Sequence, residues 1–358
     1  MPKIRVLVVE DSPTVRRRLV DILASDPDFE LVGEAPDGKR AIEICQQCRP
    51  DVITMDMMLP VMSGFSATEY IMAHCPTPIL VVSASINRGE LFKIYEALAA
   101  GAVDVLEKPT GTEAEGVWES RFIATLKMVA RIRVITHPRA RLAELRRPPP
   151  EAGPQSSESP RPGQKYDLVA IGASTGGPGA IVEILRSLPA EFQIPILLVL
   201  HINEPFGAAF ADWLDGQTSR RVAYPVEGAP LASANGRVVM APGGRHLVVR
   251  DGRLRLSNEI ERHSCRPSVD VLFESVAREC GASAAACLLT GMGRDGALGL
   301  LKIRTAGGMT IAQDESTSVI YGMPREAALL GAATHVLRLP EIGPRLAALQ
   351  GIEMEARA

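Results

Sequence analysis

The sequence predicts two α/β domains, each built on a mostly parallel sheet, joined by a polar tether. Three observations predict this class. Short apolar runs alternate with amphipathic stretches in both halves of the chain, which is the pattern of strands and helices in βαβ units. A segment rich in proline, serine and arginine interrupts the alternation. The chain has 358 residues, more than one average core accommodates.

The first half is expected to form a flavodoxin-like receiver fold with a five-stranded parallel sheet. Apolar runs typical of strands buried on both faces lie at residues 5–9, 51–55, 79–82 and 103–106. Amphipathic stretches predict helices at residues 13–24, 38–48, 64–73 and 89–100, and a last helix at 114–135. We expect this domain to span residues 1–125.

The tether comprises the end of that helix and a polar segment, residues 126–164. Its composition buries too little apolar surface to offset the entropy cost of ordering, which predicts a flexible linker. The doubly wound domain expected at residues 165–350 has predicted strands at residues 168–171, 196–200, 238–240, 286–289 and 310–312. Residues 246–256 predict an antiparallel hairpin turning at Asp251-Gly252, and residues 351–358 form a tail.

Composition argues against several classes of protein. A net charge of −3 supplies no broad electrostatic reason to bind nucleic acid. The longest apolar stretches are far shorter than the roughly 20 residues of a membrane helix, so no direct membrane insertion is expected. The N-terminus leads into a strand without a signal-peptide core, which favours a cytoplasmic location. Cys45 and Cys48 form a C-x-x-C, but no second pair completes a zinc site.

Polar side chains follow successive strands of the first domain. Glu10 and Asp11 follow the first apolar run, and Asp56, Ser83 and Lys108 follow later ones. Because parallel strands present their carboxyl ends at one edge, these groups should converge, and carboxylates at that density call for a hard cation such as Mg²⁺. Asp56 is then the expected nucleophile toward a phosphodonor, with Ser83 and Lys108 binding the phosphate. Taken singly, each residue would suit an ordinary surface charge or helix-capping role.

These positions resemble the receiver domain of two-component response regulators. The resemblance is carried by residues 8–12 (VVEDS), 55–60 (MDMMLP) and 107–109 (EKP). It implies that a histidine kinase phosphorylates Asp56, with Mg²⁺ held by Glu10, Asp11, Asp56 and Met58. Val105 occupies a position that often holds a switch aromatic, which leaves the route of signalling open.

In the second domain a glycine-rich turn follows the first predicted strand. Residues 172–179 (GASTGGPG) place Ser174 before a helix-forming stretch, which suits an acyl-transfer nucleophile. A phosphate-binding loop would use the same physics. The lysine of a P-loop is missing and the glycine order does not fit a dinucleotide fingerprint. On this segment alone, esterase and nucleotide site stay equally open.

Two further strand ends favour the esterase. His201 follows the apolar run 196–200, and Asp295 lies among glycines after another predicted strand, so nucleophile, base and orienting carboxylate could meet. His246 and His263 are competing candidates for the base. The rival interpretation is a response regulator whose second domain only binds nucleotide or protein. The sequence after the tether shows no helix-turn-helix pattern, which argues against a transcriptional output.

Six ordered motifs of this half resemble the chemotaxis protein-glutamate methylesterases. They lie at residues 172–178, 200–201, 241–247, 266–273, 291–297 and 321–327. The resemblance implies that Ser174 is the nucleophile, His201 the general base and then acid, and Asp295 the group that orients the imidazole. It also implies that Thr175 helps to hold His201 and that the Met292 N–H donates to the oxyanion.

The implied reaction is hydrolysis of methyl esters on glutamate side chains of chemoreceptor helices, together with deamidation of certain receptor glutamines. It needs no cofactor in the esterase domain, and phosphorylation of the receiver is expected to uncover Ser174. Two departures from the family pattern, residues 202–205 and Cys265, are expected to alter receptor preference more than chemistry.

Overall fold

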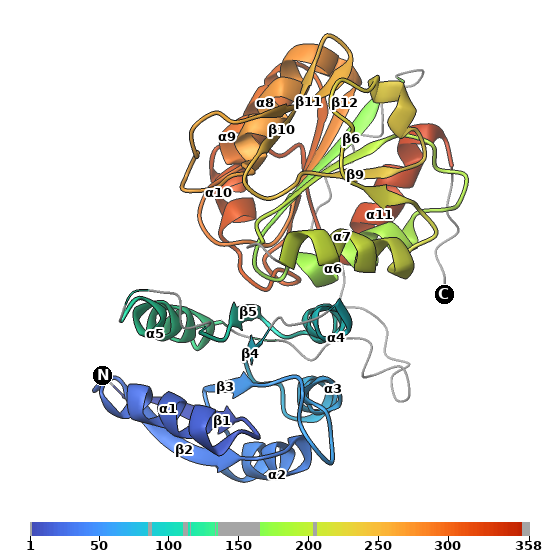
Figure 1. Cartoon of the computed structure of the whole chain (residues 1–358). Helices are drawn as coiled ribbons and strands as arrows, with labels where there is room; N and C mark the ends of the chain where they lie inside the picture. The colour runs from blue at the N-terminus through green and yellow to red at the C-terminus, as the bar shows by residue number, and fades with distance from the viewer. Residues whose placement is uncertain are drawn as a thin grey trace. The chain divides into compact units, whose positions relative to one another are not determined.

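The computed structural model describes residues 2–84, 88–109, 114, 116–132, 134, 165–202 and 206–352. The chain divides into two compact units, Met1–Pro149 and Pro150–Ala358, each described by itself below (Figure 1). Most of the predicted tether at 126–164, and residues 353–358 of the predicted tail, lie outside the described residues. Within the described ranges, every helix is too short or too polar to cross a membrane.

The first unit is a five-stranded sheet in the order β2-β1-β3-β4-β5, and every neighbouring pair is parallel. Its strands are β1 (Ile4–Val9), β2 (Phe29–Ala35), β3 (Val52–Met55), β4 (Ile79–Ser83) and β5 (Asp104–Glu107). Its helices are α1 (Pro13–Ala24), α2 (Gly38–Cys48), α3 (Gly64–His74), α4 (Arg88–Ala99) and α5 (Val117–Val129). Helices α1 and α5 cover one face and α2, α3 and α4 the other (Figure 1). The predicted receiver fold is confirmed.

Two features of this unit differ from the sequence prediction. Strand β2 has no continuous apolar run, because it lies at the sheet edge and exposes Glu30 and Glu34. The last helix is shorter than the predicted span 114–135. It ends at Val129, after which Arg131 and Ile132 donate backbone hydrogen bonds to carbonyls three residues back, which closes the last turn.

The second unit is a seven-stranded parallel sheet in the order β14-β13-β12-β6-β7-β9-β8. Its strands are β6 (Leu168–Ala173), β7 (Ile196–Leu200), β8 (Val222–Ala223), β9 (Val238–Met240), β12 (Ala284–Leu288), β13 (Met309–Gln313) and β14 (His335–Leu337). Its α-helices are α6 (Gly177–Ser187), α7 (Phe206–Gln217), α8 (Val269–Cys280), α9 (Ala297–Thr305), α10 (Met323–Leu329) and α11 (Leu339–Ala347). The short outermost strands β8 and β14 were not predicted, because so few residues carry little periodic signal.

The order of this sheet brings distant segments together. Strand β6 lies between β7 and β12, with Ala173 paired to Leu200 and Gly172 paired to Leu288. The segments that leave β6, β7 and β12 therefore start side by side at the carboxyl edge. Helices α8, α9 and α10 cover one face of the sheet, and α6, α7 and α11 cover the other (Figure 1).

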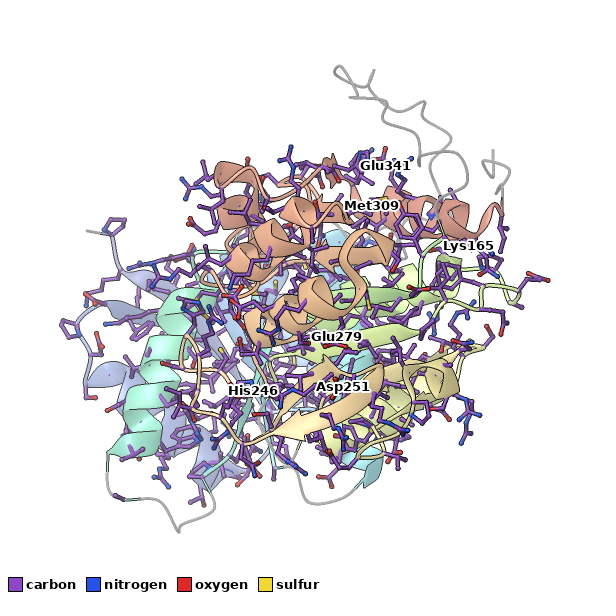
Figure 2. The ribbon with its side chains drawn as sticks, turned by 90° about the horizontal axis from the view of Figure 1, so that it is seen from above. Lys165, His246, Asp251, Glu279, Met309 and Glu341 are labelled. Carbon is purple, nitrogen blue, oxygen red and sulfur yellow. The ribbon has the colours of Figure 1, made fainter. Side chains whose placement is uncertain are left out.

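The predicted hairpin packs against helix α8. It consists of antiparallel β10 (His246–Arg250) and β11 (Arg253–Ser257), and the Val249 N–H donates to the Ser275 hydroxyl of α8 at 3.0 Å. Figure 2 shows His246 and Asp251 at the two ends of β10. Asp251 and Gly252 have φ values of 53° and 65°, as a tight hairpin turn requires. The hairpin thus supports the helix whose N-terminus faces the site described below.

Replacing Gly64 with alanine should destabilise the first unit. A Cβ at Gly64 would lie 1.9 Å from the carbonyl oxygen of Asp56, so the loop after β3 would have to move. We expect a loss of about 1–3 kcal/mol in unfolding free energy, measured by denaturant titration of the whole chain. Gly216→Ala is the matched control. It meets no atom within 4 Å and should be neutral or stabilise α7 by up to about 1 kcal/mol. Equal losses in both variants would contradict the close approach at Gly64.

Candidate active site and phosphorylation site

In the first unit, the predicted phosphoacceptor Asp56 lies buried directly after β3. Its carboxylate accepts hydrogen bonds from Lys108 Nζ at 2.8 Å, from the Ser83 hydroxyl at 3.2 Å and from the Met57 N–H at 2.7 Å. Lys108 Nζ also lies 2.7 Å from the Glu10 carboxylate. The structure therefore brings the residues predicted from four separate strand ends to one point.

The charges at this edge are coupled. Burial raises the pKa of Glu10, and the nearby Asp56 adds to that shift, while Lys108 opposes it. Burial alone would lower the pKa of Lys108, but Asp56 and Glu10 outweigh burial and raise it. The half-buried Lys108 ammonium thus pairs with two carboxylates, Glu10 and Asp56, which favour its charged form.

This donor set fits a hard divalent cation. Oxygen atoms of Glu10, Asp11 and Asp56 lie within 4.8 Å of one another, and Mg²⁺ prefers oxygen ligands with some positions left to water. The Met58 sulfur lies 3.5 Å from Lys93 Nζ, and the Met58 N–H lies 3.4 Å from an Asp56 carboxylate oxygen. The proposed part of Met58 in the metal site stays a prediction.

In the second unit, Ser174 and His201 follow paired strands. Ser174 comes directly after β6 and His201 directly after β7, and the His201 N–H donates to the Ala173 carbonyl at 3.0 Å. Ser174 is half-buried, and helix α6 begins three residues later. The two residues are therefore neighbours across the edge of the sheet, as the apolar runs predicted.

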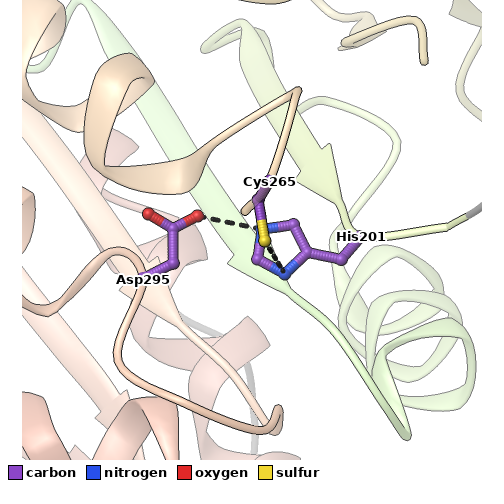
Figure 3. Close-up of side chains that lie close together, drawn as sticks. All are labelled: His201, Cys265 and Asp295. Atoms are coloured by element: carbon purple, nitrogen blue, oxygen red, sulfur yellow. Dashed lines mark hydrogen bonds and ion pairs between the residues drawn. The ribbon is translucent and has the colours of Figure 1, made fainter. Parts of the chain in front are cut away.

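His201 is held by Asp295, which arrives from the loop after β12. Its Nε2 lies 2.9 Å from a carboxylate oxygen of Asp295 (Figure 3). That carboxylate also accepts hydrogen bonds from the Ser268 hydroxyl at 2.7 Å and from the backbone N–H groups of Val269 and Asp270 at 2.7 and 3.1 Å. Asp295 thus occupies the N-terminus of α8, where unpaired N–H groups favour a negative charge.

The pKa values of this pair move in opposite directions. Burial raises the pKa of Asp295, but hydrogen bonds from His201, Ser268 and Val269 outweigh it and hold the pKa below its ordinary range. Burial lowers the pKa of His201, but Asp295 and Cys265 outweigh burial and raise it to about 9. Asp295 is therefore ionised and favours the imidazolium form of His201, which is the state a general base reaches after it accepts a proton.

The loop after β12 also approaches the serine. A Cβ at Gly291 would lie 2.7 Å from the Ser174 Cβ, so only glycine fits there. The next residue, Met292, has an N–H that donates to no acceptor among the described residues, and its side chain is 59% exposed. An unpaired backbone donor next to the serine is the arrangement that an oxyanion hole requires.

Two expected contacts do not occur in the described part of the chain. No hydrogen bond joins the Ser174 hydroxyl to His201, and none joins the Thr175 side chain to His201. The Thr175 carbonyl instead accepts from the Thr290 hydroxyl at 3.0 Å, which fixes the serine turn against the loop after β12. The roles of Ser174 and Thr175 stay predictions. Residues 203–205, one of the departures from the family pattern, lie outside the described residues.

The competing histidines have other partners. His246 is fully buried, and its ring contacts the Ser268 N–H at 3.1 Å and the Ile260 carbonyl at 3.2 Å. His263 Nε2 lies 3.1 Å from Asp270. Of the three, His201 is the one beside the strand that bears Ser174.

The sequence did not reveal two residues that contact the His201–Asp295 pair. Ser268 was seen only as a letter of the motif at residues 266–273, although a serine before an apolar helix is the ordinary sign of an N-cap. Cys265 was expected to alter receptor preference more than chemistry. Its Sγ in fact lies 3.7 Å from His201 Nδ1, a contact that sequence spacing cannot reveal (Figure 3).

These features define a class: a phosphoacceptor receiver domain followed by an α/β domain with a serine, a histidine and an aspartate at neighbouring strand ends. Family models agree with both parts. Residues 6–114 match the response regulator receiver domain and residues 169–346 match the CheB methylesterase.

Full-length relatives extend the match. The chain is 43% identical over 339 residues to protein-glutamate methylesterase/protein-glutamine glutaminase 2 of Anaeromyxobacter dehalogenans, covering 95% of each chain. It is 42% identical to the protein of that name from Pseudomonas aeruginosa, covering 96% of each. The chain therefore belongs to the protein-glutamate methylesterase/protein-glutamine glutaminase family.

Among solved structures, the chain is similar to the CheB methylesterase catalytic domain of Thermotoga maritima. The two are 33% identical with a TM-score of 0.49, and the match covers 52% of this chain and 99% of that one. The response regulator domain of CheB from the same organism is 37% identical with a TM-score of 0.33, covering 37% of this chain and 98% of that one.

Replacing Asp295 with asparagine should lower the pKa of His201 from about 9 toward its ordinary value of 6.5, because the neutral amide no longer stabilises the imidazolium. NMR titration of the imidazole signals measures this, with His201→Gln used to assign the resonance. Asp270→Asn, which alters the partner of His263, is the control and should leave His201 near its starting value. An unchanged His201 pKa in Asp295→Asn would contradict the pairing.

Proposed function

We propose that this chain hydrolyses methyl esters on glutamate side chains of chemoreceptors, and deamidates receptor glutamines, under control of its own receiver domain. The observation that carries the proposal is the His201–Asp295 pair, at the end of the strand next to the one that bears Ser174, in a chain of this family. Methylated receptor helices are the proposed substrate and a histidine kinase the proposed phosphodonor. The cytoplasmic location expected from the sequence stays a prediction.

The proposed reaction begins with proton transfer from Ser174 to His201. Since Nε2 faces Asp295, the nitrogen that accepts the proton is Nδ1. The serine oxygen attacks the ester carbonyl carbon, and the Met292 N–H donates to the resulting oxyanion. His201 returns the proton to the departing methanol, then activates a water that hydrolyses the glutamyl-enzyme. Deamidation follows the same steps with ammonia as the leaving group.

Phosphorylation is proposed to occur on Asp56. A carboxylate oxygen forms a bond to phosphorus while the bond between phosphorus and the donor breaks, and the donor leaves with that electron pair. Lys108, the Ser83 hydroxyl and the Met57 N–H, which donate to Asp56 in the structure, would bind the phosphoryl oxygens. Mg²⁺ held by Glu10, Asp11 and Asp56 would offset the negative charge that accumulates there. We propose that the phosphate raises the rate of the esterase domain, by a route that does not need an aromatic side chain at position 105.

Ser174→Ala should abolish methanol release from methylated receptor fragments, a loss of at least about 10⁴-fold, because the proposed mechanism uses the Ser174 hydroxyl as its nucleophile. Methanol is measured by a coupled assay and folding by circular dichroism. Ser233→Ala removes an exposed hydroxyl that bonds only a local carbonyl, and should retain full activity. Undiminished hydrolysis in Ser174→Ala would assign the reaction to a different nucleophile.

Acetyl phosphate with Mg²⁺ should label Asp56 and raise the esterase rate of the whole chain. Asp56→Asn should abolish both effects, because an amide cannot form the acyl phosphate. Asp51→Asn is the control. Asp51 lies directly before β3, and the asparagine oxygen can still accept the hydrogen bond from the Arg5 N–H. Intact-mass spectrometry gives the labelling and methanol release gives the rate. Activation that persists in Asp56→Asn would contradict control through this residue.

A further inference from the structure

Cys265 is a nucleophile that the proposed mechanism does not use, and it contacts the proposed general base. Figure 3 looks onto the imidazole ring of His201 and shows the sulfur over its face. The Sγ atom lies 3.7 Å from Nδ1, the nitrogen that Ser174 needs. Cys265 is half-buried, whereas Cys45 and Cys287 are buried.

A tight turn fixes the sulfur in this position. Arg262 and Cys265 exchange two backbone hydrogen bonds of 3.1 and 2.9 Å, and the two residues between them, His263 and Ser264, both have positive φ values of 52° and 58°. The His263 ring bonds Asp270 of helix α8, which anchors the turn to the core. Two non-glycine residues in the left-handed region are unfavourable, so surrounding contacts must hold this geometry.

The surroundings favour attack by this sulfur. His201 lies beside the sulfur, and its imidazolium form, which Asp295 stabilises through the other ring nitrogen, favours a neighbouring thiolate by charge attraction. The other five free cysteines differ: Cys45 and Cys287 are buried, and Cys48, Cys75 and Cys280 have no contact with a proposed catalytic group.

We propose that Cys265 is an oxidation site through which hydroperoxides reversibly switch off the esterase, an inference that rests on the proposed function. The sulfur attacks one oxygen of hydrogen peroxide, an S–O bond forms and the O–O bond breaks. The hydroxide that leaves takes the proton held by His201 and becomes water. The sulfur loses two electrons, the peroxide gains them, and the product is a sulfenic acid.

The added oxygen would inhibit by its position. It lies over the ring face next to Nδ1, where its hydroxyl competes with Ser174 for the same nitrogen and occupies the approach of the ester. A thiol reductant reverses the modification, because one thiol displaces water to form a mixed disulfide and a second thiol releases free cysteine.

The test uses the whole chain, its Cys265→Ser variant and the matched control Cys280→Ser, each treated with hydrogen peroxide. Each protein is scored against its own untreated rate. We expect the parent and Cys280→Ser to lose activity and regain it with dithiothreitol, and Cys265→Ser to lose activity at least about tenfold more slowly. Oxidation of the exposed Met292 would not be reversed by dithiothreitol, which separates the two lesions.

A readout without activity separates this inference from the proposed function. Dimedone trapping and peptide mass spectrometry should find sulfenic acid on Cys265 well before Cys280. If untreated protein releases no methanol but Cys265 is trapped, the proposed function fails and the oxidation site stands. Equal inactivation of parent and Cys265→Ser, or no preferential trapping of Cys265, would overturn the oxidation site.

Discussion

The proposed active site depends on one buried carboxylate, that of Asp295. It accepts three hydrogen bonds from the first turn of α8 and one from His201, so a single charge both caps a helix and orients an imidazole. Burial alone would raise the pKa of Asp295, and these donors hold that pKa below its ordinary range. The helix in turn is held by the hairpin β10–β11 and by α9. The orientation of the His201 imidazole therefore depends on the packing of α8 against the hairpin and α9.

The receiver also holds buried carboxylates, but it has fewer positively charged groups than carboxylates at its site. Its carboxylates share one ammonium, Lys108, and a divalent cation held by these carboxylates would offset the negative charge of an incoming phosphoryl group. In the second unit the Asp295 carboxylate accepts hydrogen bonds from two backbone N–H groups and the Ser268 hydroxyl, and its charge acts on His201. The buried carboxylates thus have different proposed roles: those of the receiver bind a cation, and Asp295 raises the pKa of His201.

The contacts between residues at strand ends were predictable, because the apolar runs locate the strands and a parallel sheet brings the carboxyl ends of its strands to one edge. Asp56, Ser83 and Lys108 meet as expected, and so do His201 and Asp295. The edge strand β2 was not predicted, because its partly exposed residues do not form a continuous apolar run. The contacts of Ser268 and Cys265 were not predicted because they depend on the path of irregular segments. The turn before Cys265 has two positive φ values, which no periodic pattern specifies.

Labelling with a fluorophosphonate tests the central claim most directly, because it needs only the nucleophile and its base. The account predicts a single adduct on Ser174, formed faster as pH rises toward the His201 pKa of about 9, since only neutral imidazole accepts the serine proton. His201→Gln should abolish the adduct. An adduct on another residue, or one on Ser174 that forms equally well without His201, would contradict a site in which Asp295 holds the base for this serine.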